Sequence, residues 1–197
     1  MTTLYLVRHG ETDWNHERRV QGHRDPPLNH AGREQARTLA AQLAGVSFDA
    51  AYASDLRRAW QTAEILLEGR GVVVTRRPRL RERYLGRWEG RVFDEIPALD
   101  PDAWRDWLTR PRDRAPHGGE TEAGLEHRAL AELTGIVADH PTGTVLVVSH
   151  GGTIHAILRG WLGLERNITT ANCGGFVIEV EENKKEIVSH IGNELTS

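Results

Sequence analysis

The sequence predicts an α/β fold: a three-layer sandwich in which helices flank a central, mostly parallel mixed sheet. Short apolar runs alternate along the chain with segments whose apolar residues recur at helical spacing. That alternation favours parallel strands joined by right-handed helical crossovers. The length of 197 residues suffices for a sizeable hydrophobic core, and we expect residues 1–197 to form a single domain.

The first quarter of the chain contains two expected strands and one expected helix. Leu4–Val7 is a β-prone apolar run that stops at a charged pair, which predicts the first strand. Apolar residues at helical spacing predict a helix over Ala31–Leu43, and Asn29 is in position to cap its N-terminus. Ala50–Ala53 predicts the second strand.

The next segment continues the alternation and then loses regularity. Ser54 or Asp55 can cap a helix that runs to about Leu67. Val72–Val74 predicts the third strand. Over residues 97–116 we expect irregular structure with one short helix.

The second half is expected to contain two helices and three strands. Glu122–Asp139 predicts a long helix, Val145–Val148 the fourth strand, and Thr153–Leu162 a further helix. Phe176–Val180 and Glu186–His190 predict a closing pair of strands. Strands and helices therefore alternate over most of the chain, as a layered fold requires.

Charge and cysteine content exclude several classes of partner. With 25 basic and 28 acidic side chains the net charge is -3, which gives no general attraction to nucleic acid or to an anionic membrane. Cys173 is the single cysteine and has no internal disulfide partner. The chain contains no run of about 18 apolar residues and no secretory signal pattern. We expect a cytoplasmic protein without nucleic-acid or membrane partners. Its oligomeric state stays open, with a homodimer as one option.

Polar residues follow the first and fourth strands at the point where each ends. Arg8 and His9 come directly after the first strand, and Ser149-His150-Gly151-Gly152 follows the fourth. In open α/β sheets ligands bind beyond the carboxyl ends of the strands. We therefore expect His9 and His150 to meet in one crevice.

Four blocks along the chain extend this pattern. They are Arg8–Thr12 with Trp14, Asn15, Gly22, Leu28 and Gly32; Ser54–Ala59 with Gln61–Ala63; Leu80–Glu82 with Gly86, Glu89 and Gly90; and Ser149–Gly152. In this order they resemble the signature of the histidine phosphatase superfamily, also called the phosphoglycerate mutase-like family, across the whole chain. The resemblance implies the phosphoglycerate mutase-like α/β fold and an activity in phosphoryl transfer.

Phosphoryl transfer requires positioning and charge stabilisation of a group that is close to a dianion at neutral pH. Arg8 and Arg58 can each donate bidentate hydrogen bonds to phosphate oxygens. A structural ion pair is the alternative for each arginine. The resemblance makes His9 the nucleophile that forms a phosphohistidine, and we expect His150 to donate to the phosphoryl oxygens.

The leaving alcohol requires a proton donor, and Glu82 is our choice. After the alcohol departs, the same side chain as a carboxylate can take a proton from the attacking water. Glu11 and Glu89 are the alternative acids. We favour a role for Glu11 in orienting its loop and a structural role for Glu89.

The phosphate cradle is expected to be completed by Asn15 and by the backbone near Gly22 and Gly151. In mutases of the family the position before Gly22 often carries a small hydroxyl residue, whereas this chain has Gln21. Many phosphatases of the family also have glutamine there, so this departure favours hydrolysis. Gln21 as a simple loop hydrogen-bonding residue is the alternative.

Two segments bear on the substrate. The arginine-rich segment 76–91 would favour a second phosphate or a carboxylate if it faced the pocket. A solvated rim paired with nearby acids is the alternative, and we favour it slightly. Residues 97–116 could form a lid, although the tryptophans there would equally serve to pack a short helix onto the domain.

These observations together favour a metal-independent phosphatase of the histidine acid type, with a small, possibly acidic, phosphorylated metabolite as substrate. No cofactor is expected, and the ten histidines lack the close paired spacing of a zinc site. One alternative is a 2,3-bisphosphoglycerate-dependent phosphoglycerate mutase. Mutases of the family usually carry a longer insertion than the stretch from Glu82 to Ser149 allows. The other alternative is a phospholigand-binding module without turnover, which would need neither a nucleophile nor a proton donor.

Overall fold

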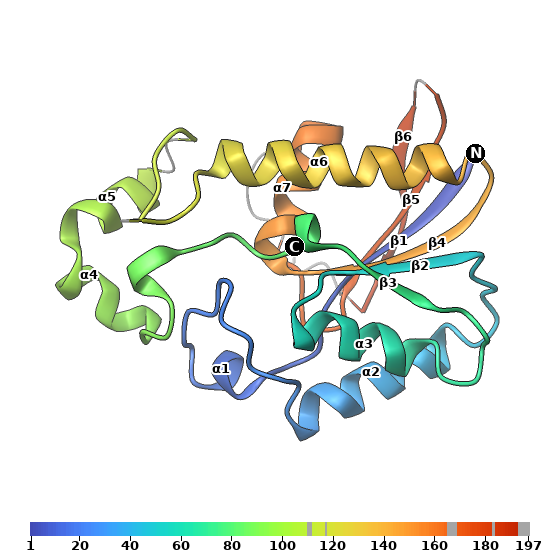
Figure 1. Ribbon diagram of the computed structural model, residues 1–197, viewed down its shortest axis with the longest axis horizontal. Coiled ribbons are helices and arrows are strands. Elements are labelled where there is room, and N and C mark those ends of the chain that lie inside the picture. Colours follow the sequence, from blue (N-terminus) through green and yellow to red (C-terminus); the bar gives the residue numbers. More distant parts are fainter. Residues whose placement is uncertain (110–111, 117, 165–168, 183, 193–197) are drawn as a thin grey trace.

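The computed structural model describes residues 1–109, 112–116, 118–164, 169–182 and 184–192 (Figure 1). Its strands are β1 (Thr2–Arg8), β2 (Ala50–Ala53), β3 (Val74–Arg76), β4 (Gly143–Ser149), β5 (Gly175–Val180) and β6 (Lys185–Ile191). They form a six-stranded sheet in the order β3-β2-β4-β1-β5-β6. Strands β3, β2, β4 and β1 are parallel, whereas β5 and β6 each pair antiparallel with the preceding strand in that order. The predicted mostly parallel mixed sheet is confirmed.

The helices connect these strands as the sequence predicts, with additions. They are α1 (Asp13–His16), α2 (His30–Gln42), α3 (Arg57–Leu66), α4 (Ile96–Leu99), α5 (Pro101–Thr109), α6 (Glu122–Asp139) and α7 (Gly151–Leu162). Short 3-10 helices lie at Pro78–Leu80, Gly86–Trp88 and Phe93–Glu95. Within the described residues, none of the helices combines the length and the hydrophobicity needed to cross a bilayer.

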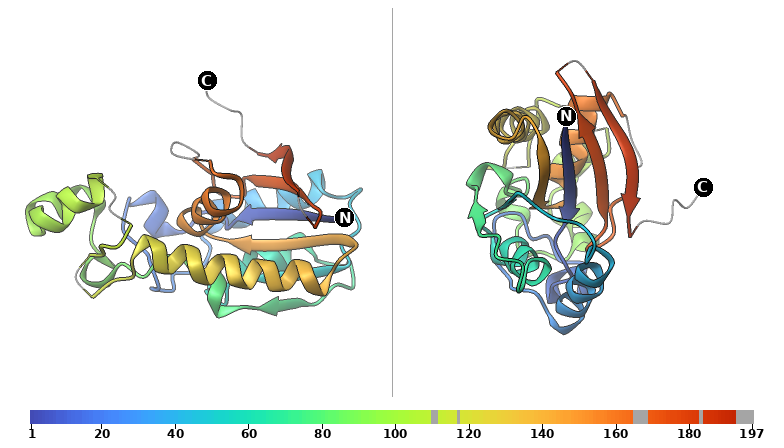
Figure 2. Two further views of the ribbon diagram at one scale, coloured as in Figure 1. Left: turned by 90° about the horizontal axis from the view of Figure 1, so that it is seen from above. Right: turned by 90° about the vertical axis from the view of Figure 1, so that its right-hand side faces the viewer.

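Helices cover both faces of the sheet, so the fold has three layers. Figures 1 and 2 show α2 and α3 on one side of the strands and α6 and α7 on the other. Strand alternation supplies a separate apolar surface to each side. Leu4 and Leu6 of β1 belong to the cluster under α6 and α7, whereas Val7 belongs to the cluster over α2 and α3. In β4, Val145 and Leu146 divide between the two clusters in the same way.

The region before α6 differs from its prediction, because it contains two helices where one was expected. In Figure 1, α4 and α5 project beyond the carboxyl ends of the parallel strands. Their side chains pack on a third, separate cluster that is centred on Val20, Trp88 and Ile96. Trp107 of α5 packs against Trp88 edge to face, with a ring-centroid distance of 5.5 Å. The aromatic residues that the sequence shows here thus build a small core of their own.

The start of α3 corrects a second prediction, since neither Ser54 nor Asp55 is its N-cap. The cap residue is Leu56, whose side chain makes no capping hydrogen bond. Instead Asp25 from a distant loop accepts a hydrogen bond of 2.6 Å from the backbone N–H of Arg57. The Asp55 carboxylate is engaged by Arg81 and is therefore occupied elsewhere.

The third strand lies two residues later than expected. The prediction placed it at Val72–Val74, whereas β3 comprises Val74–Arg76. Val73 is 83% exposed. The apolar run at residues 72–74 therefore coincides only in part with the residues that pair in the sheet. A strand at the edge of a sheet has a neighbour on one side only, so its apolar residues are a weaker guide to pairing.

Candidate active site

The site begins where β1 and β4 end side by side. The two strands are parallel and pair Arg8 with Ser149 in register, so the next residues, His9 and His150, emerge together. The backbone N–H of His9 donates to the carbonyl of Ser149 at 3.0 Å. The two imidazole rings lie with centroids 5.1 Å apart and an interplanar angle of 60°. The structure therefore places both histidines at one point, as the strand-end argument predicts.

The His9 ring has a fixed orientation and a neutral charge state. Its Nδ1 lies 2.7 Å from the carbonyl oxygen of Gly10. A carbonyl can only accept, so Nδ1 carries the proton and Nε2 keeps its lone pair. Burial, together with Arg58 and Arg8, holds the pKa of His9 well below its usual value of 6.5. His9 thus presents an unprotonated ring nitrogen near neutral pH.

Two buried guanidinium groups flank this nitrogen. Arg58, in the first turn of α3, donates to the carbonyls of Arg24 and Gly22 at 2.8 Å each. Arg8 donates from Nη1 to the carbonyl of Thr170 at 2.6 Å. Burial lowers the pKa of Arg58 to about 10, which leaves it charged at neutral pH.

Both guanidinium groups keep unused donors. The Nε atoms of Arg8 and Arg58 are buried and have no hydrogen-bond partner among the described residues. Neither arginine forms an ion pair with a described carboxylate, so the alternative of a structural ion pair lacks support. Two anchored cations with spare N–H groups form a strong anion site.

Glu82 faces the same space from the segment between β3 and α6. Its carboxylate accepts hydrogen bonds from the backbone N–H groups of Gly152 at 2.9 Å and Arg83 at 2.8 Å. Position 152 must be glycine for this approach, since a Cβ atom there would lie 2.5 Å from Glu82 Oε1. The start of α7 therefore holds the carboxylate in place.

The two alternative acids have structural contacts instead. Glu11 accepts a hydrogen bond of 2.9 Å from the side chain of Asn29, which joins its loop to the start of α2. Glu89 accepts from the backbone N–H groups of His23 at 2.8 Å and Leu85 at 3.1 Å. Of these three carboxylates, Glu82 is the one that lines the cavity.

His150 and Gly151 adjoin the cavity directly, His150 through the ring of His9 and Gly151 through the side chain of Arg8. His150 is fully buried and caps α7 without a side-chain hydrogen bond. Neither of its ring nitrogens has a partner in the described part of the chain, and burial followed by Arg58 lowers its pKa well below 6.5. Gly151 packs beside Arg8, and the residue that lines the cavity is Gly152. The backbone contribution to the phosphate cradle that was expected near Gly151 is thus shifted by one residue, to Gly152.

The loop after β1 supplies the three remaining predicted residues. Asn15, Gln21 and Gly22 all line the cavity. The Asn15 Oδ1 atom accepts from the backbone N–H of Thr12 at 3.1 Å in a capping box at the start of α1. Gly22 has a φ of +50°, a conformation that favours glycine. Gln21 Oε1 is buried without a partner among the described residues, so the loop leaves it available to a ligand.

The cavity has a volume of about 390 Å³ and two chemically different parts. We call the part lined by Arg8, His9, Asn15, Gln21, Gly22, Arg58, Glu82 and Gly152 the strand end. We call the rest the distal wall, which is formed by Arg19, Val20, Arg83, Leu85, Trp88, Phe93, Trp107, Glu122, Leu125, His155, Ala156 and Arg159. From the sequence, a role near the substrate was considered for two segments that contribute to the distal wall, the arginine-rich segment 76–91 and the possible lid 97–116. The other residues of the wall come from separate segments and share no motif.

Each arginine of the distal wall is paired with a glutamate. Arg159 lies 2.9 Å from Glu122 and 2.8 Å from Glu126. Arg83 lies 3.5 Å from Glu122, and Arg19 makes an ion pair of 2.9 Å with a neighbouring glutamate. Positive charge in this half of the cavity is thus balanced locally.

The arginine-rich segment 76–91 is mainly a rim. Of its arginines, Arg83 is the one that lines the cavity. Arg81 pairs with Asp55 at 2.6 Å, and Arg77 lies 3.4 Å from Glu132. The preferred alternative of a rim paired with acids therefore describes most of this segment.

Metal ligands are not grouped in the described part of the chain, where no cluster of three or more His, Cys, Asp or Glu side chains could hold an ion. Cys173 is buried, and burial raises the pKa of its thiol to about 12. A thiol with that pKa is a poor nucleophile at neutral pH. The ionisable side chains that line the strand end carry imidazole, guanidinium and carboxyl groups.

Comparisons with known proteins place this geometry in a family. The family model of the histidine phosphatase superfamily (branch 1) matches residues 4–192. Phosphoglycerate mutase-like protein 4 of Arabidopsis thaliana is 40% identical over 158 residues, which cover 78% of this chain and 68% of that protein. Phosphoserine phosphatase 1 of Hydrogenobacter thermophilus is 32% identical over 201 residues, which cover 98% of this chain and 95% of that protein. The solved structure of a mycobacterial glucosyl-3-phosphoglycerate phosphatase, complexed with VO3, has a TM-score of 0.86 at 31% identity and covers 95% of this chain and 97% of its own. These matches support phosphatase or mutase activity.

Proposed function

Because the chain belongs to the histidine phosphatase superfamily, we propose that it hydrolyses phosphate monoesters of small metabolites through a phosphohistidine at His9, without a metal ion. One observation carries the proposal. The acceptor nitrogen of a neutral, oriented His9 ring lies beside two buried arginines that are anchored on backbone carbonyls and keep N–H donors unused.

In the first step the phosphate dianion binds between Arg8 and Arg58, which offset its charge. His9 Nε2 attacks phosphorus, and the bond from phosphorus to the ester oxygen breaks. Protonated Glu82 gives its proton to the departing alcohol oxygen, so the alcohol leaves neutral. His150, whose ring nitrogens have no described protein partner, donates a hydrogen bond to a phosphoryl oxygen.

In the second step a water molecule attacks phosphorus and the bond to His9 Nε2 breaks. The Glu82 carboxylate takes a proton from this water and is ready for another cycle. Inorganic phosphate then leaves, and His9 returns to its neutral form. The two steps divide one difficult displacement into two easier ones.

The leaving group is expected to lie against the distal wall. Aromatic and aliphatic side chains, among them Trp107, Phe93 and Leu125, alternate there with charge-balanced pairs of arginine and glutamate. This composition supports a monoester whose non-phosphate part is uncharged or of balanced charge. A strongly acidic leaving group has less support, since no arginine of the distal wall is left without a carboxylate.

Phosphoglycerate mutase activity is the second candidate, because the Arabidopsis relative carries a mutase-like name at 40% identity. Against it stands the compact connection from β3 to β4, in which α4 and α5 are the helices that precede α6. A mutase must return the phosphoryl group to its substrate and exclude water, whereas a phosphatase must admit water.

The test measures inorganic phosphate released from nitrophenyl phosphate and from 3-phosphoglycerate, with a chelator present. From the unmodified chain we expect release with nitrophenyl phosphate and slower release with the acidic 3-phosphoglycerate, and we expect none from His9→Ala. A matched control is His16→Ala, an exposed histidine of the same loop region, which should retain activity. Interconversion of phosphoglycerates that requires bisphosphoglycerate primer, without phosphate release, would establish the mutase instead.

A further inference from the structure

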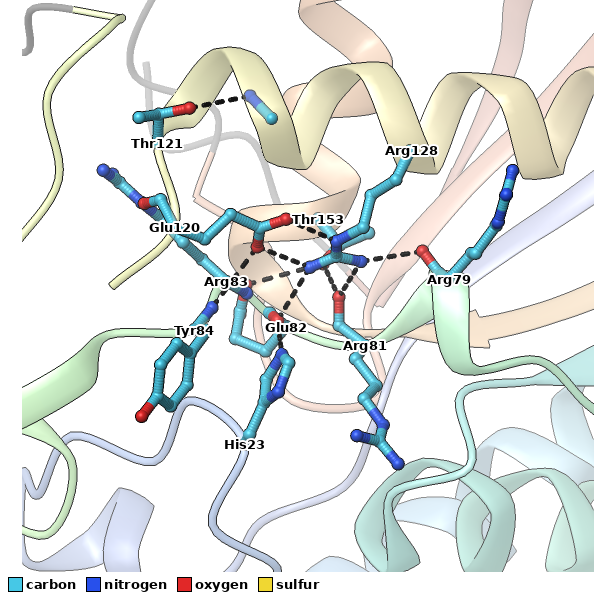
Figure 3. A network of polar contacts seen from close by, with 11 residues as sticks. His23, Arg79, Arg81, Glu82, Arg83, Tyr84, Glu120, Thr121, Arg128 and Thr153 are labelled. Carbon is cyan, nitrogen blue, oxygen red and sulfur yellow. Dashed lines mark hydrogen bonds and ion pairs between the residues drawn. The ribbon is translucent and has the colours of Figure 1, made fainter. Parts of the chain in front are cut away.

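The guanidinium group of Arg128, which lies outside the cavity, forms hydrogen bonds to several backbone carbonyls of the segment that contains Glu82. Figure 3 shows Arg128 reaching from α6 to this segment. Its Nη1 atom donates to the carbonyls of Arg79 at 2.7 Å and Arg81 at 2.8 Å, and its Nη2 atom donates to the carbonyl of Glu82 at 2.9 Å. Three carbonyls within four residues are thus held by a single side chain.

Glu120 fixes the remaining donors of the same guanidinium. Its two carboxylate oxygens accept from Arg128 Nε at 2.6 Å and from Nη2 at 2.8 Å. All five N–H groups of Arg128 therefore have partners. The side chains of Arg128 and Glu120 are 19% and 20% exposed, so solvent screens this pair weakly. The arrangement is rigid, since each contact restricts the orientation of the planar group.

The same segment is also held from the opposite side. In Figure 3, His23 approaches the Glu82 carbonyl from across the segment, and its Nε2 donates at 2.9 Å. The Thr153 hydroxyl donates to the carbonyl of Arg81 at 2.9 Å. The backbone around Glu82 is therefore clamped, while its carboxylate points to the start of α7 and to the cavity.

From this geometry we infer that Arg128 is a positioning residue for proton transfer: it holds the backbone of residues 79–82 so that the Glu82 carboxyl reaches the leaving oxygen. Arg128 does not line the cavity, so it acts through Glu82 and touches no reacting atom. The inference rests on the proposed role of Glu82. Lysine could not replace Arg128, because one nitrogen with three donors cannot reach three carbonyls and a carboxylate together.

The experiment compares two substrates whose leaving groups differ in their need for a proton. Nitrophenolate leaves readily without protonation, whereas the alkoxide of glycerol 2-phosphate requires a proton donor. For Arg128→Met we expect kcat/KM, which reports the steps up to departure of the alcohol and not hydrolysis of the phosphohistidine, to fall about 10- to 100-fold with glycerol 2-phosphate, the size of effect that misplacement of a catalytic group produces. With nitrophenyl phosphate we expect kcat/KM to fall less than about 3-fold, because the acid contributes little to the departure of nitrophenolate.

Arg70→Met is the matched control, because Arg70 also holds three backbone carbonyls, those of Ala40, Leu43 and Val46, at 2.9 to 3.0 Å. These contacts lie at the C-terminal end of α2 and just beyond it, and Arg70 does not line the cavity. Its replacement should lower stability without changing the ratio of the two kcat/KM values. An equal loss of kcat/KM with both substrates in Arg128→Met would show a purely structural role and overturn the inference.

A double-mutant cycle with Glu82→Gln separates the inference from the proposed function. If Arg128 acts through Glu82, adding Arg128→Met to Glu82→Gln should cause no further selective loss with glycerol 2-phosphate. A Glu82→Gln variant that lowers kcat/KM equally for both substrates would remove Glu82 as the proton donor and with it the proposed mechanism. A selective Glu82→Gln combined with a non-selective Arg128→Met would overturn the positioning role alone.

Folding is checked by circular dichroism. If Arg128→Met does not fold, Arg128→Lys keeps the positive charge but loses most of the five contacts. It should show the same substrate selectivity with a smaller loss, and a lysine variant without selectivity would overturn the inference.

Discussion

The two halves of the cavity use the same residue type in opposite ways. At the strand end, Arg8 and Arg58 are anchored on backbone carbonyls, which leaves their positive charge available to a ligand. In the distal wall, Arg83 and Arg159 are paired with glutamates, which cancels theirs. A backbone carbonyl orients a guanidinium group and leaves its positive charge uncompensated, whereas a carboxylate orients the group and also neutralises its charge. The hydrogen-bond partner of an arginine therefore determines whether its charge is available to an anionic ligand.

The largest expected effect at the strand end follows from removal of His9, the proposed nucleophile. His9→Ala should reduce phosphate release by about 10,000-fold or more, since groups that act as a catalytic unit fail together. Phosphate release measured with nitrophenyl phosphate and normalised to folded protein checks this. A variant with more than about a tenth of the original rate would assign the nucleophile to another residue.

Replacement of an arginine by lysine in each half of the cavity tests the contrast between carbonyl-anchored and carboxylate-paired arginines. Arg58→Lys should lower kcat/KM by about 100-fold, because lysine cannot reproduce both the carbonyl anchors and the spare donors. Arg159→Lys in the distal wall should change kcat/KM by less than about 3-fold, since a paired, partly exposed charge contributes little. Steady-state kinetics on both variants provide the comparison, and equal losses would contradict it.

Two buried histidines, His9 of the strand end and the adjacent His150, should make stability depend on pH. The pKa values of His9 and His150 are lowered in the folded protein, so below about pH 6.5 the unfolded chain takes up protons that the folded chain does not. The contribution of these two neutral histidines to the free energy of unfolding should therefore be at its maximum above that pH. Below it, the loss should be about 1.4 kcal/mol per pH unit for each histidine until the lowered pKa is reached.

Urea unfolding at pH 7.5 and pH 5.5 measures this dependence. In His150→Asn the contribution of one histidine disappears, so the pH dependence should decrease by about 1.4 kcal/mol per pH unit. A variant with the unmodified slope would show that His150 is already protonated in the folded state.

The smallest expected effect comes from a substitution that leaves part of the positive charge of the distal wall unpaired, as it is at the strand end. Glu122→Gln removes the carboxylate that Arg83 and Arg159 share. KM for 3-phosphoglycerate, which carries a second negative charge, should fall about 2- to 5-fold, in the range of a partly exposed ion pair. KM for nitrophenyl phosphate is the internal control and should remain within about 2-fold. A parallel change in both values would locate the leaving group elsewhere.

Much of the site was predictable from the order of strands. The apolar runs that became β1 and β4 both end in polar residues, and the rule for strand ends in open α/β sheets then brings His9 and His150 together. Arg58 and Glu82 followed from the sequence blocks. The long elements α2 and α6 were predicted within a residue at each end, because their apolar periodicity and caps are local signals.

The remaining features depend on contacts between distant segments. The N-terminus of α3 is capped from Asp25, and no local pattern marks that residue. The choice of Gly152 over Gly151 depends on where α7 meets Glu82, which is 70 residues away in sequence. The distal wall likewise forms only when α5, α6 and α7 meet around the cavity. The periodicity of a sequence indicates which face of a helix or strand is buried. It does not indicate which side chain from a distant segment will contact that helix or strand.

The third apolar cluster, centred on Val20, Trp88 and Ile96, is separate from the two that hold the sheet. Residues that pack around it, such as Phe93 and Trp107, also form part of the distal wall. Substitutions there would alter the surface proposed to contact the leaving group and would leave the β1 and β4 strand ends untouched. Substrate range could therefore change through this cluster without any change in the residues proposed to transfer the phosphoryl group.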